Sequence, residues 1–108
     1  MKLTREQVAQ LSDLELNRGM IWLYWDKKIQ KNYTYMCSLY KFGLLKTKIE
    51  YLTDYNLTIP LAFDNGLSVD MSELRFTHVH SAYEYSRRKN PLRAICEVLL
   101  MIAMEREV

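Results

Sequence analysis

Near its C-terminal end the sequence reads Asn90-Pro91-Leu92-Arg93-Ala94-Ile95-Cys96-Glu97-Val98-Leu99-Leu100-Met101-Ile102-Ala103-Met104. Asn90 is a favoured helix N-cap, and Pro91 suits the first helical position because its missing N–H would have no partner there. At about 100° per residue, apolar side chains share one broad face: Leu92, Ile95, Cys96, Val98, Leu99, Ile102 and Ala103. Because Arg93 and Glu97 interrupt it, the apolar stretch is too short to span a bilayer. It predicts a central core helix.

The opposite face of this helix carries two methionines, Met101 and Met104, beside charged residues. Methionine is flexible and polarisable, and exposed methionines are common on surfaces that bind other proteins. We therefore take Met101 and Met104 as partner-binding candidates. The alternative is that the N-terminal segment of the chain covers them.

The composition predicts one folded domain, residues 1–108. The chain is 49% hydrophobic and 12% aromatic, and no repeat or Pro/Gly-rich linker divides it. A net charge of +2 does not by itself favour nucleic acid or a membrane as the partner. The N-terminus lacks the apolar core of a signal peptide, so we expect a cytoplasmic protein in which Cys37 and Cys96 stay reduced.

Two capping boxes, Thr4–Gln7 and Ser12–Glu15, mark the starts of helices. The second predicts a helix over residues 13–25 with two apolar faces. One face carries Leu14, Ile21, Trp22 and Trp25, and the nearly opposite face carries Leu16, Met20 and Leu23. This second face must be covered by the sheet or another helix, or by another protein, so its three residues are partner-binding candidates. Arg18 lies in the first face and needs a carboxylate or carbonyl partner if it is buried.

The middle of the chain predicts the remaining elements. Alternating residues predict a strand at about 32–40, and residues 44–52 fit either a second strand or a short helix. A cap residue, an early proline and a final Asn-Gly predict a helix of about two turns over 58–66. Residues 67–71 and 74–85 predict a hairpin. The expected fold is therefore α+β, with helices packed on one face of a small antiparallel sheet and the C-terminal helix central to the core.

Three blocks of the sequence, covering about half of it, are similar to one known family. The first is Leu11-Ser12-Asp13-Leu14-Glu15-Leu16-Asn17-Arg18 with Trp22, the second is Asp54-Tyr55-Asn56 followed by Ile59-Pro60-Leu61-Ala62-Phe63-Asp64-Asn65-Gly66-Leu67-Ser68-Val69, and the third is Asn90-Pro91-Leu92-Arg93-Ala94-Ile95-Cys96. The arrangement resembles the NinX-like family of small phage and prophage proteins. The resemblance implies a phage accessory protein acting inside a bacterium, and it implies no catalytic residue.

His78 and His80 are the only residues with a spacing typical of metal ligands. On a strand, the His-x-His pattern places both imidazoles on one face. No third and fourth ligand follows at a recognisable spacing, so we expect neither a metal nor a cofactor. The sequence also lacks a nucleophile turn, a glycine-rich phosphate loop and an organised acid pair, and it predicts no enzyme.

Two basic clusters are candidates for nucleic-acid binding, because lysines contact phosphates and aromatic rings stack on bases. One combines Lys27, Lys28 and Lys31 with Tyr33 and Tyr35 and continues to Lys48; the other is Arg87, Arg88, Lys89 and Arg93. Lysines along an exposed strand also protect its edge from pairing, so a solvated face is the competing interpretation. The arginines oppose a helix dipole, which a neighbouring carboxylate would offset.

The sequence thus favours a non-enzymatic accessory protein that binds a host or phage macromolecule, most simply a protein. Its contact surface would be the second face of the 13–25 helix together with Met101 and Met104, with a homodimer as one outcome. The alternative is a small nucleic-acid-binding protein that uses the lysine and tyrosine surface.

Overall fold

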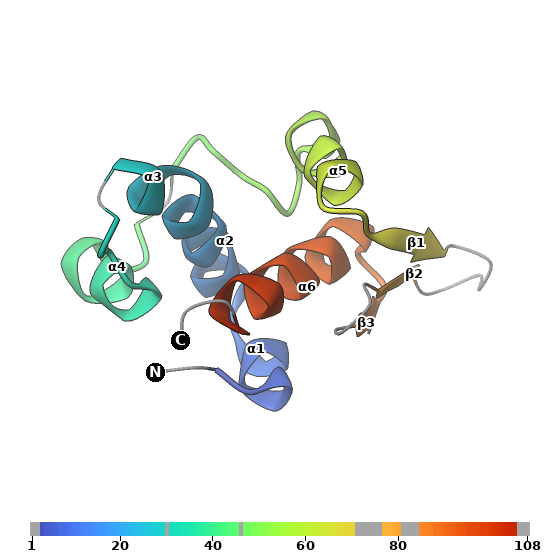
Figure 1. Ribbon diagram of the computed structural model, residues 1–108, viewed down its shortest axis with the longest axis horizontal. Coiled ribbons are helices and arrows are strands. Elements are labelled where there is room, and N and C mark those ends of the chain that lie inside the picture. The colour runs from blue at the N-terminus through green and yellow to red at the C-terminus, as the bar shows by residue number, and fades with distance from the viewer. Residues whose placement is uncertain (1–2, 30, 46, 71–76, 81–84, 106–108) are drawn as a thin grey trace.

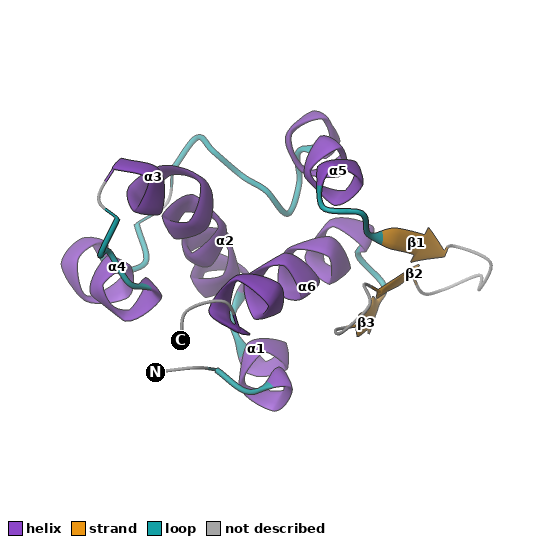
Figure 2. Cartoon of the chain, in the orientation of Figure 1, coloured by secondary structure: helices purple, strands orange, loops and turns teal. Residues whose placement is uncertain are grey.

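The computed structural model describes residues 3–29, 31–45, 47–70, 77–80 and 85–105 (Figure 1). In chain order the elements are α1 (Arg5–Gln10), α2 (Asp13–Ile21), the π-helix η1 (Trp22–Asp26), α3 (Lys27–Ile29), α4 (Tyr35–Phe42), α5 (Tyr55–Asp64), β1 (Ser68–Asp70), β2 (Thr77–His80), β3 (Tyr85–Arg88) and α6 (Pro91–Glu105). The strands form an antiparallel sheet in the order β1-β2-β3. The predicted α+β class is confirmed, and Figure 2 shows helices as the larger part.

Helix α6 is the centre of the molecule, as predicted. Asn90 caps it, because its Oδ1 accepts a hydrogen bond from the backbone N–H of Leu92 at 3.0 Å. The amide of the same side chain donates to the carbonyl of Leu52 at 3.1 Å, which ties the start of the helix to a distant loop. Helices α1, α2 and α5 and strands β2 and β3 all contact α6. Because neighbours surround it, α6 is buried on nearly every side instead of on one face.

Both predicted capping boxes are present at the starts of α1 and α2. Helix α2 then packs between α6 and α4, and Gly19 permits this close approach. A Cβ on Gly19 would lie 3.0 Å from Leu100 of α6 and 3.1 Å from Tyr35 of α4, closer than side chains ordinarily pack. The second face of the 13–25 helix is therefore covered within the chain, one of the two arrangements that the sequence allowed.

The strand predicted at residues 32–40 is wrong, because this segment forms helix α4. Thr34 caps it through a hydrogen bond from the backbone N–H of Cys37 at 3.1 Å, and Gly43 ends it with a positive φ of 60°. The two buried residues of α4, Tyr35 and Ser38, lie three apart, which is a helical spacing. The alternation of aromatic residues suggested a strand, but the cap, the glycine and packing against α2 determine a helix.

Residues 44, 45 and 47–52 form neither of the two predicted elements. Their backbone is held by the side chain of Asn17, which donates to the carbonyl of Ile49 at 2.9 Å and accepts from the N–H of Tyr51 at 2.8 Å. One amide side chain thus replaces the hydrogen bonds that a strand would take from a neighbouring strand.

The helix predicted over 58–66 is confirmed as α5, but it begins at Tyr55. Thr58 is not its cap; its hydroxyl lies inside the helix and donates to the carbonyl of Tyr51. The predicted hairpin corresponds to β1 and β2; of the turn expected at residues 70–73, only Asp70, the last residue of β1, lies within the described residues. The third strand, β3, is an element that the sequence pattern did not predict.

Candidate functional site

Two arginines of the second basic cluster, Arg88 and Arg93, bind a buried carboxylate. Glu97 of α6 is only 1% exposed. Arg88 donates to both of its oxygens, with Nε and Nη2 each at 2.9 Å, and the Nε of Arg93 lies 3.3 Å from Oε2. This bidentate geometry is the one in which a guanidinium binds a carboxylate most strongly. Glu97 is therefore the neighbouring carboxylate that offsets the unfavourable interaction of these arginines with the dipole at the N-terminal end of α6.

Arg93 is held from a second side as well. Its Nη1 lies 2.6 Å from Oδ1 of Asp13, and its Nη2 donates to the carbonyl of Leu11 at 2.6 Å. These contacts link the start of α2 to α6. The prediction that Arg88 and Arg93 present free cations to phosphates is therefore wrong. Arg87 and Lys89 remain exposed beside them.

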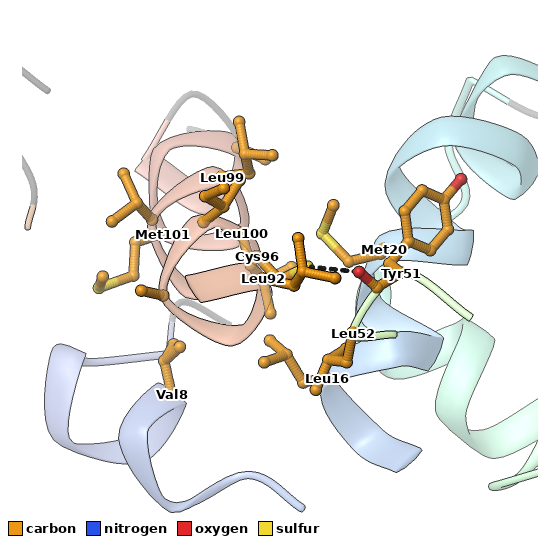
Figure 3. Packing of buried hydrophobic residues seen from close by; sticks show 14 of the residues in the cluster. Val8, Leu16, Met20, Tyr51, Leu52, Leu92, Cys96, Leu99, Leu100 and Met101 are labelled. Carbon is orange, nitrogen blue, oxygen red and sulfur yellow. Dashed lines mark hydrogen bonds between the residues drawn. The ribbon is translucent and has the colours of Figure 1, made fainter. Parts of the chain in front are cut away.

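The predicted methionine surface is also wrong. Met101 and Met104 are 4% and 2% exposed. Figure 3 shows Val8 of α1 on the side of α6 that carries Met101. Helix α1 contacts α6, so the competing interpretation, cover by the N-terminal segment, fits the burial of Met101. Sequence periodicity placed them opposite the apolar face, but it cannot show that α1 packs there.

The candidates on α2 are likewise buried within the chain. Leu16 and Met20 are fully buried, and Figure 3 shows them between α2 and α6. Leu23 is half-buried and lines a small hollow between η1 and α6. Neither Leu16 nor Met20 can therefore contact another protein without opening the core.

The two histidines lie on β2, as predicted. In the sheet, His78 is opposite Arg87 of β3 and Asp70 of β1, and His80 is exposed. Within the part of the chain that the structure describes, no three His, Cys, Asp or Glu residues come together as metal ligands would. Cys37 is exposed and Cys96 is buried, and burial raises the pKa of the Cys96 thiol.

The tyrosines of the first basic cluster pack inward. Tyr35 is 3% exposed and meets Trp22 edge-to-face, with ring centroids 5.9 Å apart. Tyr33 packs against Phe42, and its hydroxyl is shielded from solvent. The prediction that Tyr33 and Tyr35 offer open ring faces to bases is therefore wrong. Lys28 and Lys31 are exposed, and the ammonium of Lys27 lies 5.1 Å from the ring centroid of Trp22.

An apolar groove of about 490 Å³ opens beside these lysines, and we call it the aromatic groove. It is lined by Tyr24, Trp25, Lys28, Ile29, Tyr51, Leu57 and Leu61. These residues come from η1, α3, the loop before α5, and α5 itself. Trp25 is 47% exposed and Ile29 is 78% exposed, although both side chains are large and apolar. Such exposure on a concave surface is typical of a binding site.

The π-helical turn of η1 explains why Trp25 faces this groove. In an α-helix, Trp22 and Trp25 would share a face, as the sequence pattern predicts. A π-helix bonds residues five apart and is wider, so positions three apart turn away from each other. Trp22 is fully buried, whereas Trp25 is half-exposed. The sequence pattern cannot show a π turn, which is why this difference was missed.

Hydrogen bonds and ring contacts fix the floor of the groove. The indole Nε1 of Trp25 donates to the hydroxyl of Tyr51 at 2.7 Å, and the rings of Tyr24 and Tyr51 lie 6.1 Å apart at 30°. Burial raises the pKa of Tyr24 to about 12 and raises that of Tyr51 as well. Both hydroxyls therefore stay protonated at neutral pH and act as hydrogen-bonding groups instead of bases.

A second hollow of about 140 Å³ adjoins the groove at Ile29, and we call it the Lys41 hollow. Its lining is Asp26, Ile29, Tyr33, Lys41 and Phe42. The carboxylate of Asp26 is paired with Arg18, and Ser38 Oγ also donates to it at 2.8 Å. Arg18, which needed a partner if buried, therefore has one.

No protein-family model matches the chain, and comparison with curated proteins and with solved structures finds no match. None of the described helices is long and apolar enough to cross a membrane.

Proposed function

We propose that this protein is a non-enzymatic accessory protein that acts by binding another protein in the aromatic groove. The observation that carries the proposal is the exposure of Trp25 and Ile29 at the edge of an apolar groove. Tryptophan and tyrosine anchors surrounded by apolar side chains dominate the binding energy of many protein interfaces. The groove thus takes the place of the methionine surface that the sequence suggested.

The chemistry of the groove favours a protein over nucleic acid. Stacking requires open ring faces, but Tyr24 and Tyr51 lie against each other. Among the described residues that line the groove, Lys28 alone is a cation. Two of the cations in the second basic cluster, Arg88 and Arg93, are bound to Glu97. These features favour a protein as the partner. Nucleic acid remains the alternative, and the first experiment below distinguishes the two.

The setting of this function is part of the proposal. The resemblance of the three sequence blocks to NinX-like proteins supports a phage accessory protein whose partner is a host or phage protein.

Capture from bacterial and phage-infected lysates tests the proposal. The immobilised protein should retain a partner protein after nuclease treatment. Trp25→Ala should raise the Kd for the retained partner about 30-fold, because a central aromatic anchor contributes about 2 kcal/mol or more to binding. Tyr40→Ala is the matched control: this side chain is 94% exposed on α4 and lines neither hollow.

Two results would contradict the proposal. If nuclease releases the captured material, the nucleic-acid alternative holds. If Trp25→Ala and Tyr40→Ala retain equal amounts of partner, the groove is not the contact surface. Light scattering of the purified protein tests the homodimer, since a mass that rises with concentration and falls with Trp25→Ala would make a second copy the partner.

A further inference from the structure

The aromatic groove and the Lys41 hollow form one continuous surface. Ile29 lines both, and its 78% exposed side chain stands between them. On one side lie Trp25, Tyr51 and the α5 leucines; on the other lie Tyr33 and Phe42. A partner that crosses Ile29 would place one apolar side chain in each hollow.

Each half of this surface carries one lysine that has no ion-pair partner among the described residues. Lys28 lines the aromatic groove and Lys41 lines the second hollow. No carboxylate among the described residues pairs with either lysine. Asp26, which lines the second hollow, is already paired with Arg18 and hydrogen-bonded by Ser38. The surface therefore presents two net positive charges beside its apolar hollows.

From this charge pattern we propose that the partner contributes an acidic amphipathic segment. Its apolar side chains occupy the two hollows on either side of Ile29, and its carboxylates pair with Lys28 and Lys41. Opposite charges at the edge of an apolar contact give specificity and speed association. This inference rests on the proposed function, because it names the chemistry of the protein that the groove binds.

Selection from a display library of random peptides tests the inference without a known partner. Peptides enriched on the wild-type protein but not on Trp25→Ala should combine apolar anchors with an excess of Asp and Glu. The double variant Lys28→Glu with Lys41→Glu should bind the enriched peptides about tenfold more weakly, since two exposed ion pairs are replaced by repulsion. The same selection on this variant should enrich Lys and Arg.

The matched control is Lys89→Glu, which makes the same charge change at an exposed position outside both hollows. It should leave binding of the selected peptides within twofold of wild type. Thermal unfolding of all three variants shows whether a loss of binding reflects a loss of folding.

The outcomes separate the inference from the proposed function. Peptides that depend on Trp25 but carry neutral or basic residues overturn the acidic partner and leave the protein-binding groove intact. Failure to enrich any peptide on wild type over Trp25→Ala also overturns the inference, whereas lysate capture still decides the proposed function. If single-stranded DNA displaces the bound peptides at equal concentration, the lysines serve nucleic acid and the inference fails.

Discussion

The two basic clusters look alike in the sequence but do opposite things in the structure. Arg88 and Arg93 surround the buried Glu97 and join α6 to β3 and α2. Lys28 and Lys41 stand beside apolar hollows and pair with no described carboxylate. A guanidinium is planar and weakly hydrated, so it suits a buried bidentate pair, whereas an ammonium is strongly hydrated and stays at the surface. The residue type therefore separates a structural cluster from a candidate binding surface.

The largest effect should come from removing the centre of the arginine cluster. Glu97→Ala leaves two guanidinium groups without their buried carboxylate, and it should lower the free energy of unfolding by about 3–5 kcal/mol. Asp13→Asn is the graded control, because Asp13 contacts the same Arg93 but its side chain is 75% exposed. It should cost less than about 1 kcal/mol. Urea unfolding measures both, and equal effects would show that burial does not determine the contribution of the pair.

A matched loss of charge sharpens the comparison between the clusters. Arg88→Gln removes two hydrogen bonds to a buried carboxylate and should cost about 1.5–3 kcal/mol. Lys28→Gln removes the same formal charge from an exposed side chain and should change stability by less than about 0.5 kcal/mol. Thermal unfolding of the two variants at one pH gives the difference. Similar losses of stability in the two variants would mean that Lys28, like Arg88, stabilises the fold. Lys28 would then not be available to a partner in the aromatic groove.

The sequence predicts the elements whose signals are local. The caps at Thr4, Ser12 and Asn90 and the apolar run of α6 set the helix ends that the structure has. The prediction for residues 32–40 was wrong. Their side chains alternate as in a strand, but packing against α2 determines a helix there. The requirement that Arg18 find a partner was predicted, but its partner, Asp26, was not.

The candidate site was only partly predictable, for physical reasons. Trp25, Tyr24 and Lys28 belong to a mixture of lysines and aromatic residues that the sequence does mark. Tyr51 and Leu57 reach the groove through contacts with residues about thirty positions away, and the π turn of η1 separates Trp25 from Trp22. The spacing of Leu57 and Leu61, four residues apart, was the one signal that could have placed α5 at the groove.

The smallest effect concerns alkaline pH, where the two regions should again differ. Arginine as a residue type stays charged well above neutral pH. The pKa of Tyr24 is raised from 10.0 to about 12 because burial disfavours its anion. Between these two values the unfolded chain loses the proton while the folded chain keeps it. The contribution of Tyr24 to the free energy of unfolding should therefore be constant below pH 10 and fall as the pH rises toward 12.

Tyr24→Phe tests this assignment, because it removes the titrating hydroxyl and keeps the ring in the groove. Its free energy of unfolding, measured by urea titration from neutral pH upward, should fall less steeply than that of the wild type above pH 10. Part of the slope should remain, since burial also raises the pKa of Tyr51, of Tyr35 and of the Cys96 thiol. Tyr40→Phe removes a hydroxyl from an exposed side chain and should follow the wild-type curve. Wild type and Tyr24→Phe falling in parallel would mean that Tyr24 is solvated in the folded protein, and that the floor of the aromatic groove is more open than its packing against Tyr51 indicates.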